Sequence, residues 1–171
     1  MSRAGVVGLA LCICGGLGWA QAEGQATGRD AASSSTVLGI TNPLLAEGTE
    51  RIRHGDYDDG IRLIRLGLER ESPNAFNRAA ALSNLCAAYA AKNMPDTAIE
   101  QCTESLQITN KNWRAYSNRA YAYWLKGMYA QARVDVDAAI ALSPQARQVL
   151  QIRGMINETG LTARLSVDER Q

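Results

Sequence analysis

The chain has 171 residues, with 18 lysines and arginines against 17 aspartates and glutamates, so its formal net charge is only +1. This length leaves room for one ordinary domain, and the balanced charge excludes an electrostatic case for nucleic acid or an anionic membrane as partner. Hydrophobic residues make up 46% of the chain, but only one of them is phenylalanine and many are alanine. Because alanine is the best helix former, this composition favours closely packed helices over a large aromatic core.

The N-terminal segment, residues 1–22, has the pattern of an export signal. Arg3 precedes an apolar run over residues 4–19, and residues 20–22 (Ala-Gln-Ala) have the small-x-small pattern that a signal peptidase cleaves. The apolar run is shorter than a membrane span and is broken by glycines. We therefore expect cleavage after Ala22 and no stable membrane span afterwards, with a retained anchor as the alternative. The sequence predicts an exported protein that is periplasmic, with secretion as the alternative.

Residues that cap or interrupt helices recur along the rest of the chain. Residues 23–41 are rich in glycine, serine and threonine and have no helical period, which predicts a flexible leader. Asn42-Pro43, Ser72-Pro73 and Ser143-Pro144 each place a capping side chain before a proline, as the first turn of a helix prefers. Helices are expected over 43–54, 58–70, 73–92, 95–109, 113–126, 129–142 and 144–158, followed by a frayed tail at 159–171.

Two segments of the chain align with each other end to end without a gap. One is KNMPDTAIEQCTESLQITN, from Lys92, and the other is KGMYAQARVDVDAAIALSP, from Lys126. The two segments begin 34 residues apart. Helix pairs at a spacing of 34 residues match the period of the tetratricopeptide repeat (TPR), and the chain resembles that family over about 41–157. The family's small residues fall at Ala120, Ala132 and Ala139 in one unit, which Pro144 closes, and at Ala98 in the unit before it.

The resemblance implies an all-α, right-handed helical-repeat solenoid. Its units would be 41–74, 79–112 and 113–146, covered by a capping helix at 144–158. The first unit is degenerate, because Arg51 stands where tyrosine is usual, and it is four residues longer than the others. Gly60 and Gly67 stand at its close helix contacts, where the later units have small residues on both helices.

One charged residue stands where the family often has leucine. Arg119 lies on the packed face of its predicted helix, and Asp135 follows sixteen residues later on the partner helix. Repeats that read Asn-Arg-Ala in the first helix frequently carry an aspartate at this place in the second. We predict an Arg119–Asp135 ion pair between the two helices, with a structural role.

The resemblance also implies where a ligand would bind. In this family the first helix of each pair lines the concave side, which holds an extended peptide or a partner's helix. The matching positions here are Ser83, Asn84, Ala87, Arg114, Ser117, Asn118, Tyr121 and Trp124, with Gln148 and Gln151 from the capping helix. The alternative for Tyr121 and Trp124 is that they pack on the neighbouring helix.

The carboxylate-gripping variant of the family uses a five-residue clamp of lysine, asparagine and arginine. Asn84 matches it and Arg114 replaces a lysine, whereas the other three positions read Leu45, Thr49 and Asn118. Two of five residues do not make a clamp, so an acidic tail is not the expected ligand.

No pattern in the chain predicts catalysis, a metal site or a cofactor. His54 is the only histidine, and the predicted mature chain keeps two cysteines, Cys86 and Cys102, without a Cys-x-x-Cys motif. These cysteines lie on inward positions of one unit with an expected Cα separation of about 6 Å, which is marginal for a bridge. Of the two outcomes we expect buried thiols, in a compartment that is itself oxidising.

Two functions remain open on the sequence. The first is a non-catalytic interaction module of the cell envelope, whose concave groove binds a protein partner. The second is a structural subunit that self-associates or packs into a larger envelope assembly. The outer positions Val134, Ala138 and Ala141 are only mildly apolar and do not decide between them.

Overall fold

The computed structural model describes residues 42–70 and 72–168, and over these residues it confirms the predicted all-α fold. The described residues contain seven helices: α2 (Pro43–Arg53), α3 (Tyr57–Arg70), α4 (Ala75–Ala91), α5 (Pro95–Ile108), α6 (Trp113–Leu125), α7 (Tyr129–Leu142) and α8 (Arg147–Asp168). The predicted signal at 1–22 and leader at 23–41 lie outside the described residues.

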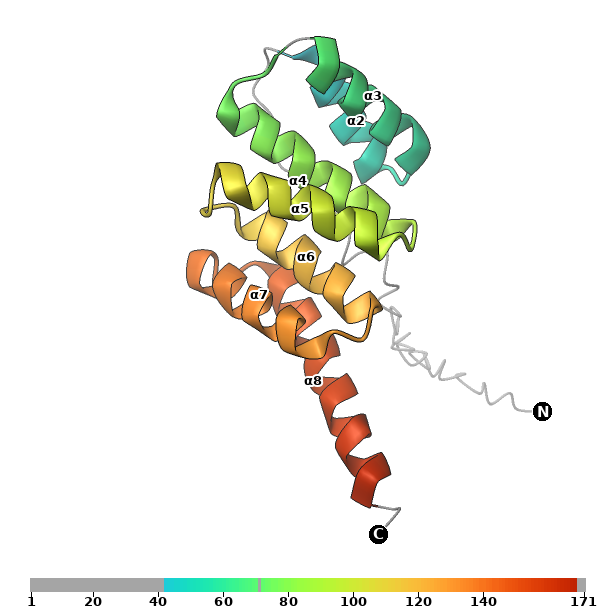
Figure 1. Cartoon of the computed structure of the whole chain (residues 1–171), viewed down its shortest axis with the longest axis vertical. Helices are drawn as coiled ribbons and strands as arrows, with labels where there is room; N and C mark the ends of the chain where they lie inside the picture. Colours follow the sequence, from blue (N-terminus) through green and yellow to red (C-terminus); the bar gives the residue numbers. More distant parts are fainter. Residues whose placement is uncertain (1–41, 71, 169–171) are drawn as a thin grey trace, which may run out of the picture.

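The helices stack as successive pairs along the long axis of the molecule (Figure 1). Within the pairs α2 packs on α3, α4 on α5 and α6 on α7, and α8 packs on α7 and α6. Helices α2, α4, α6 and α8 also contact one another in sequence, whereas α3, α5 and α7 contact only even-numbered helices within the described part of the chain. We call α2, α4, α6 and α8 the inner row, because helices that touch along a curved stack lie on its inside.

Asparagine caps begin three of the inner helices. The Asn42 side chain accepts the Leu45 amide at 3.0 Å ahead of Pro43, as predicted. At α4 the prediction is wrong, because Ser72 has a φ of +37° and the cap is Asn74, which accepts the amide of Asn77 at 2.9 Å. The third cap is Asn112, at α6.

The start and end of α8 both differ from the prediction. Ser143 is the C-cap of α7, and Pro144 follows it in the connection, where proline is common because it cannot continue the helix. Helix α8 begins at Arg147 and runs to Asp168. The prediction of a frayed tail is therefore wrong for residues 159–168. A single glycine, Gly160, costs only about 1 kcal/mol of helix propensity and does not end the helix.

Glycines set the contact between α2 and α3. A Cβ added at Gly60 would lie 2.9 Å from the Gly48 carbonyl oxygen and 2.5 Å from Cγ1 of Ile52. One added at Gly67 would lie 2.8 Å from Cδ2 of Leu45. The two backbones therefore approach too closely for any larger residue, as predicted for Gly60 and Gly67.

The later pairs use small side chains at the corresponding contacts. Ala98, Ala120, Ala132 and Ala139 are all fully buried in the core that α4 to α8 share. Cys86 and Cys102 are buried there too, and they form a disulfide with a Cα–Cα distance of 5.3 Å. The expectation of two thiols is thus wrong, because the helices approach within the range of about 4.4–6.8 Å that a disulfide spans.

Candidate interaction surface

A chain of polar contacts links the four helices of the inner row. Asn84 of α4 donates its Nδ2 hydrogen to Oγ1 of Thr49 on α2 at 2.9 Å. Asn118 of α6 donates to the Ser83 carbonyl of α4 at 3.1 Å, and its Oδ1 accepts from Nε2 of Gln148 on α8 at 2.9 Å. Both asparagines are fully buried. Their amides link helices, a role that the sequence analysis did not anticipate.

Tyr121 and Trp124 pack on each other, and Trp124 also contacts α8. Their rings stack with centroids 5.9 Å apart and planes at 12°. The indole nitrogen of Trp124 donates to Oγ1 of Thr159 at 3.0 Å. Tyr121 is only 5% exposed, and burial, with a smaller contribution from Tyr57, raises the pKa of its phenol. These contacts agree with the alternative in which the two rings pack on a neighbouring helix, although Trp124 stays half-buried.

Three polar atoms on the inner row lack a hydrogen-bond partner among the residues that the structure describes. They are Oγ of Ser83, Oγ of Ser117 and Nε of Arg114. Both serines are fully buried, and they stand at the same position of successive repeat units. A buried polar group without a partner costs about 1–3 kcal/mol, so three of them on one row need an explanation. Of the other predicted groove residues, Ala87 is buried on the same helix as Ser83, and Gln151 is half-buried on α8.

Arg114 is an isolated cation on this row. Its guanidinium carbon lies 4.2 Å from the centre of the Trp113 ring, and no carboxylate of the described residues forms an ion pair with it. Burial lowers its pKa. A half-buried guanidinium without a counter-charge favours the approach of an acceptor, such as a peptide carbonyl or a carboxylate.

The predicted Arg119–Asp135 ion pair is present on the packed face of α6. Nε and Nη2 of Arg119 donate to the two carboxylate oxygens of Asp135 at 2.7 and 2.9 Å. The third contact, from Nη1 to Oγ1 of Thr103 on α5, is 3.1 Å long. The hydrogen bonds to Asp135 raise the pKa of Arg119. The pair therefore ties α6 to both α7 and α5, which supports a structural role.

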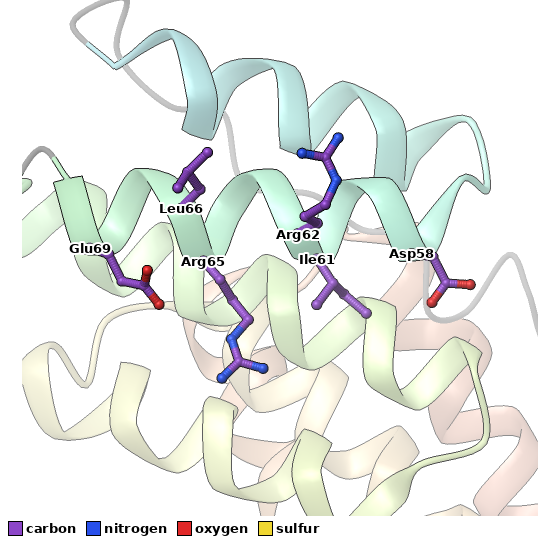
Figure 2. A pocket seen from close by; sticks show the side chains of 6 residues that line it. All are labelled: Asp58, Ile61, Arg62, Arg65, Leu66 and Glu69. Carbon is purple, nitrogen blue, oxygen red and sulfur yellow. The ribbon is translucent and has the colours of Figure 1, made fainter.

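One hollow, along the outer helix α3, contains no predicted site residue. The hollow in Figure 2, about 510 Å³ in volume, runs along α3 and is lined by Asp58, Ile61, Arg62, Arg65, Leu66 and Glu69. Arg65 and Glu69 point to one side of this helix and Arg62 to the other (Figure 2). Among the described residues no three histidine, cysteine or acidic side chains are grouped as a metal site would need.

Known proteins resemble this chain in sequence and in fold. No protein-family profile matches it. DnaJ homolog subfamily C member 3 from Rattus norvegicus is 29% identical over 108 residues, which cover 63% of this chain and 21% of that protein. The Mus musculus protein is 31% identical over 98 residues, or 57% and 19% of the two chains. This chain therefore spans about a fifth of the length of the curated relatives that it matches.

Solved TPR domains superpose on most of the chain. The first TPR domain of the human RPAP3 protein has a TM-score of 0.63 at 19% identity, covering 72% of this chain and 94% of that one. The Hsp90 co-chaperone Cns1 from Saccharomyces cerevisiae has a TM-score of 0.65 at 21% identity, covering 74% and 42%. The described chain has the TPR fold.

The order of the described helices and their packing in pairs are those of a TPR domain. One solved relative, the first TPR of Spaghetti (RPAP3), is bound to the HSP90 peptide SRMEEVD; its TM-score is 0.60 at 19% identity, with coverage of 68% and 91%. Within the described residues of the present chain, no helix is both long enough and apolar enough to span a membrane.

Proposed function

We propose that this TPR domain is a protein-interaction module of the cell envelope, which binds a peptide or a partner's helix along its inner row. The observation that carries the proposal is the half-buried guanidinium of Arg114 on the inner row, which forms no ion pair with a described residue. A peptide lying along α6 would supply this guanidinium with carbonyl acceptors. The peptide bound to a solved TPR relative makes this the kind of ligand to test first.

The chemistry of the row favours a neutral peptide over an acidic tail. Leu45, at one clamp position, is fully buried in the core, and Thr49, at another, accepts the hydrogen bond from Asn84. Arg114 is then the single cation among the clamp positions, which is too little charge to hold two or more carboxylates against their hydration. The peptide SRMEEVD, which the solved relative binds, should therefore show no saturable binding to this protein at concentrations up to about 1 mM.

Two observations support an exported protein, periplasmic or secreted. Residues 1–22 have the pattern of a cleaved signal. The Cys86–Cys102 disulfide is typical of oxidising compartments, because cytosolic thiols are kept reduced. Intact mass of the protein isolated from its cell, alkylated without reductant, should match a chain that begins at Glu23 and carries no alkyl group on either cysteine. Two alkylated cysteines would contradict export, whereas an intact signal with the bridge formed would show the retained anchor instead of cleavage.

The partner experiment compares two arginines. Arg114→Gln changes the inner row, and Arg133→Gln changes an exposed arginine on the outer helix α7. Both variants should keep the helical circular dichroism signal of the mature protein. In a pull-down from envelope extract, Arg114→Gln should recover at least about fivefold less of the wild-type partner, which corresponds to roughly 1 kcal/mol, whereas Arg133→Gln should recover the wild-type amount. Equal recovery by both variants would place binding elsewhere.

A second function, self-association, is favoured by apolar side chains on α7. Val134 is 69% exposed and Leu142 is 41% exposed, both on the outer side of the stack. Surface residues of this kind can form an interface between copies of the chain. Light scattering on the mature protein separates the two functions. A monomer at a protein concentration of about 100 µM supports the interaction module. A stable dimer that dissociates on the substitution Val134→Lys supports the structural subunit.

A further inference from the structure

The disulfide joins the helix at the centre of the stack to its outer partner. Cys86 of α4 and Cys102 of α5 are both fully buried, and α4 contacts α2, α3, α5 and α6. Ser83 stands three residues before Cys86 and Ala87 directly after it, so the bridge anchors the same helix turn that carries two of the inner-row positions. The position of α4 therefore affects the units on both sides as well as the inner row.

The next unit shows that the fold itself does not require the bridge. One repeat further along the chain, Ala120 and Val136 stand at the positions of Cys86 and Cys102, and both are buried without a covalent link. An alanine and a valine thus fill this contact between paired helices of the same fold. The second unit has a covalent bond where the third has simple packing, and it adjoins the glycine-packed first unit, in which fewer side-chain atoms hold the helices together.

We propose that the Cys86–Cys102 bridge is a redox-dependent brace, which holds α4 against α5 and keeps the inner row in its binding arrangement. Forming the brace removes two protons and two electrons from the two thiols. A disulfide-bearing oxidant, such as a thiol–disulfide oxidoreductase, accepts them and leaves as a dithiol. Because both sulfurs are buried, exchange with a dithiol reductant requires α4 and α5 to separate locally. The part of this proposal that concerns binding rests on the function proposed above.

The test uses the mature protein in three forms. The first is oxidised, and the second is reduced with a dithiol and then alkylated while thermal cycling exposes the thiols. The third is the double variant Cys86→Ala with Cys102→Val. The double variant copies the third unit and is the matched control, since it lacks the bridge but keeps the contact filled. We expect the oxidised protein to melt about 10–20 °C above both other forms, because the bridge removes entropy only from the unfolded chain. We expect added reductant to leave the melting temperature of the double variant unchanged.

Amide hydrogen exchange tests the bracing of α4 separately from partner binding. In the oxidised protein the amides of 83–88 should exchange at least about tenfold more slowly than in the double variant, while those of 117–122, at the same positions in the third unit, should change less than about twofold. Equal melting temperatures and equal exchange in the three forms would overturn the brace. Slower exchange with equal partner recovery by oxidised protein and double variant would overturn its role in binding. Failure of every form to recover a partner would overturn the proposed function but leave the brace supported.

Discussion

Arg119 holds three helices together through its contacts with Asp135 and Thr103. Its guanidinium satisfies both oxygens of a carboxylate that is 5% exposed and also reaches Thr103. Removing one partner of such a pair leaves the other charge buried and costs about 3–5 kcal/mol, whereas replacing both can cost little. We predict that urea unfolding will show a larger loss of stability for Arg119→Leu than for Arg119→Leu with Asp135→Leu. A double variant as unstable as the single one would contradict a coupled pair.

Two glycines within helices should respond in opposite ways to alanine. Gly60→Ala places a methyl group 2.9 Å from the Gly48 carbonyl oxygen, so backbone atoms must move, and we expect a loss of about 1–3 kcal/mol. Gly154 in α8 has no atom within 4 Å of an added Cβ, so alanine there should gain up to about 1 kcal/mol of helix propensity. Thermal unfolding of both variants measures the contrast. A stabilising Gly60→Ala would show that the α2–α3 contact is looser than described.

The buried phenol of Tyr121 predicts a loss of stability in alkali. Burial raises its pKa in the folded protein above the usual value of 10.0, so the neutral form is favoured by folding. This contribution is fully present below about pH 10 and is lost as the pH rises through the folded-state pKa. We expect Tyr121→Phe to unfold less steeply with pH above about 10 than the wild type, measured by circular dichroism at fixed urea. Parallel curves for the two proteins would contradict the assignment.

At the scale of the helix, the Asn118 side chain joins three helices by hydrogen bonds. It connects α6 to α4 through the Ser83 carbonyl and to α8 through Gln148. Asn118→Ala leaves a buried carbonyl and a half-buried amide without these bonds, so we expect a loss of about 2–4 kcal/mol. Asn157→Ala, at an exposed position of α8, is the control and should change stability by less than about 0.5 kcal/mol. A loss below about 1 kcal/mol for Asn118→Ala would mean that water replaces these bonds.

The helices and their pairing could be predicted from the sequence because they depend on the repeat period. The same register predicted the glycine contacts and the Arg119–Asp135 pair, since each follows from the position of a residue within its unit. The start of α4 could not be predicted in this way, because it depends on the local backbone at Ser72, which has a positive φ. The disulfide was missed because the expected Cα separation of about 6 Å is close to the limit for a bridge, and the helices approach slightly closer than that.

The inner row was predicted less well than the fold, for a physical reason. Carrying positions over from the family identifies which residues stand on the inner helices, but it does not say which of them the helices themselves use. Asn84 and Asn118 hold neighbouring helices together, and Tyr121 is part of the core. Arg114, Ser83 and Ser117 are the positions whose polar atoms the described helices leave unpartnered. Their burial and missing partners depend on the packing of several helices and could only be seen in the structure.

At the scale of the whole molecule, the central claim is that a partner lies along the inner row. Two glutamines allow a direct test: Gln151 stands on the inner helix α8 and Gln131 on the outer helix α7. A photoreactive amino acid is placed at one position or the other, and the protein is irradiated in envelope extract. The claim predicts that the variant labelled at 151 gives a covalent adduct with the partner and the variant labelled at 131 does not. An adduct formed from 131, with none from 151, would contradict it.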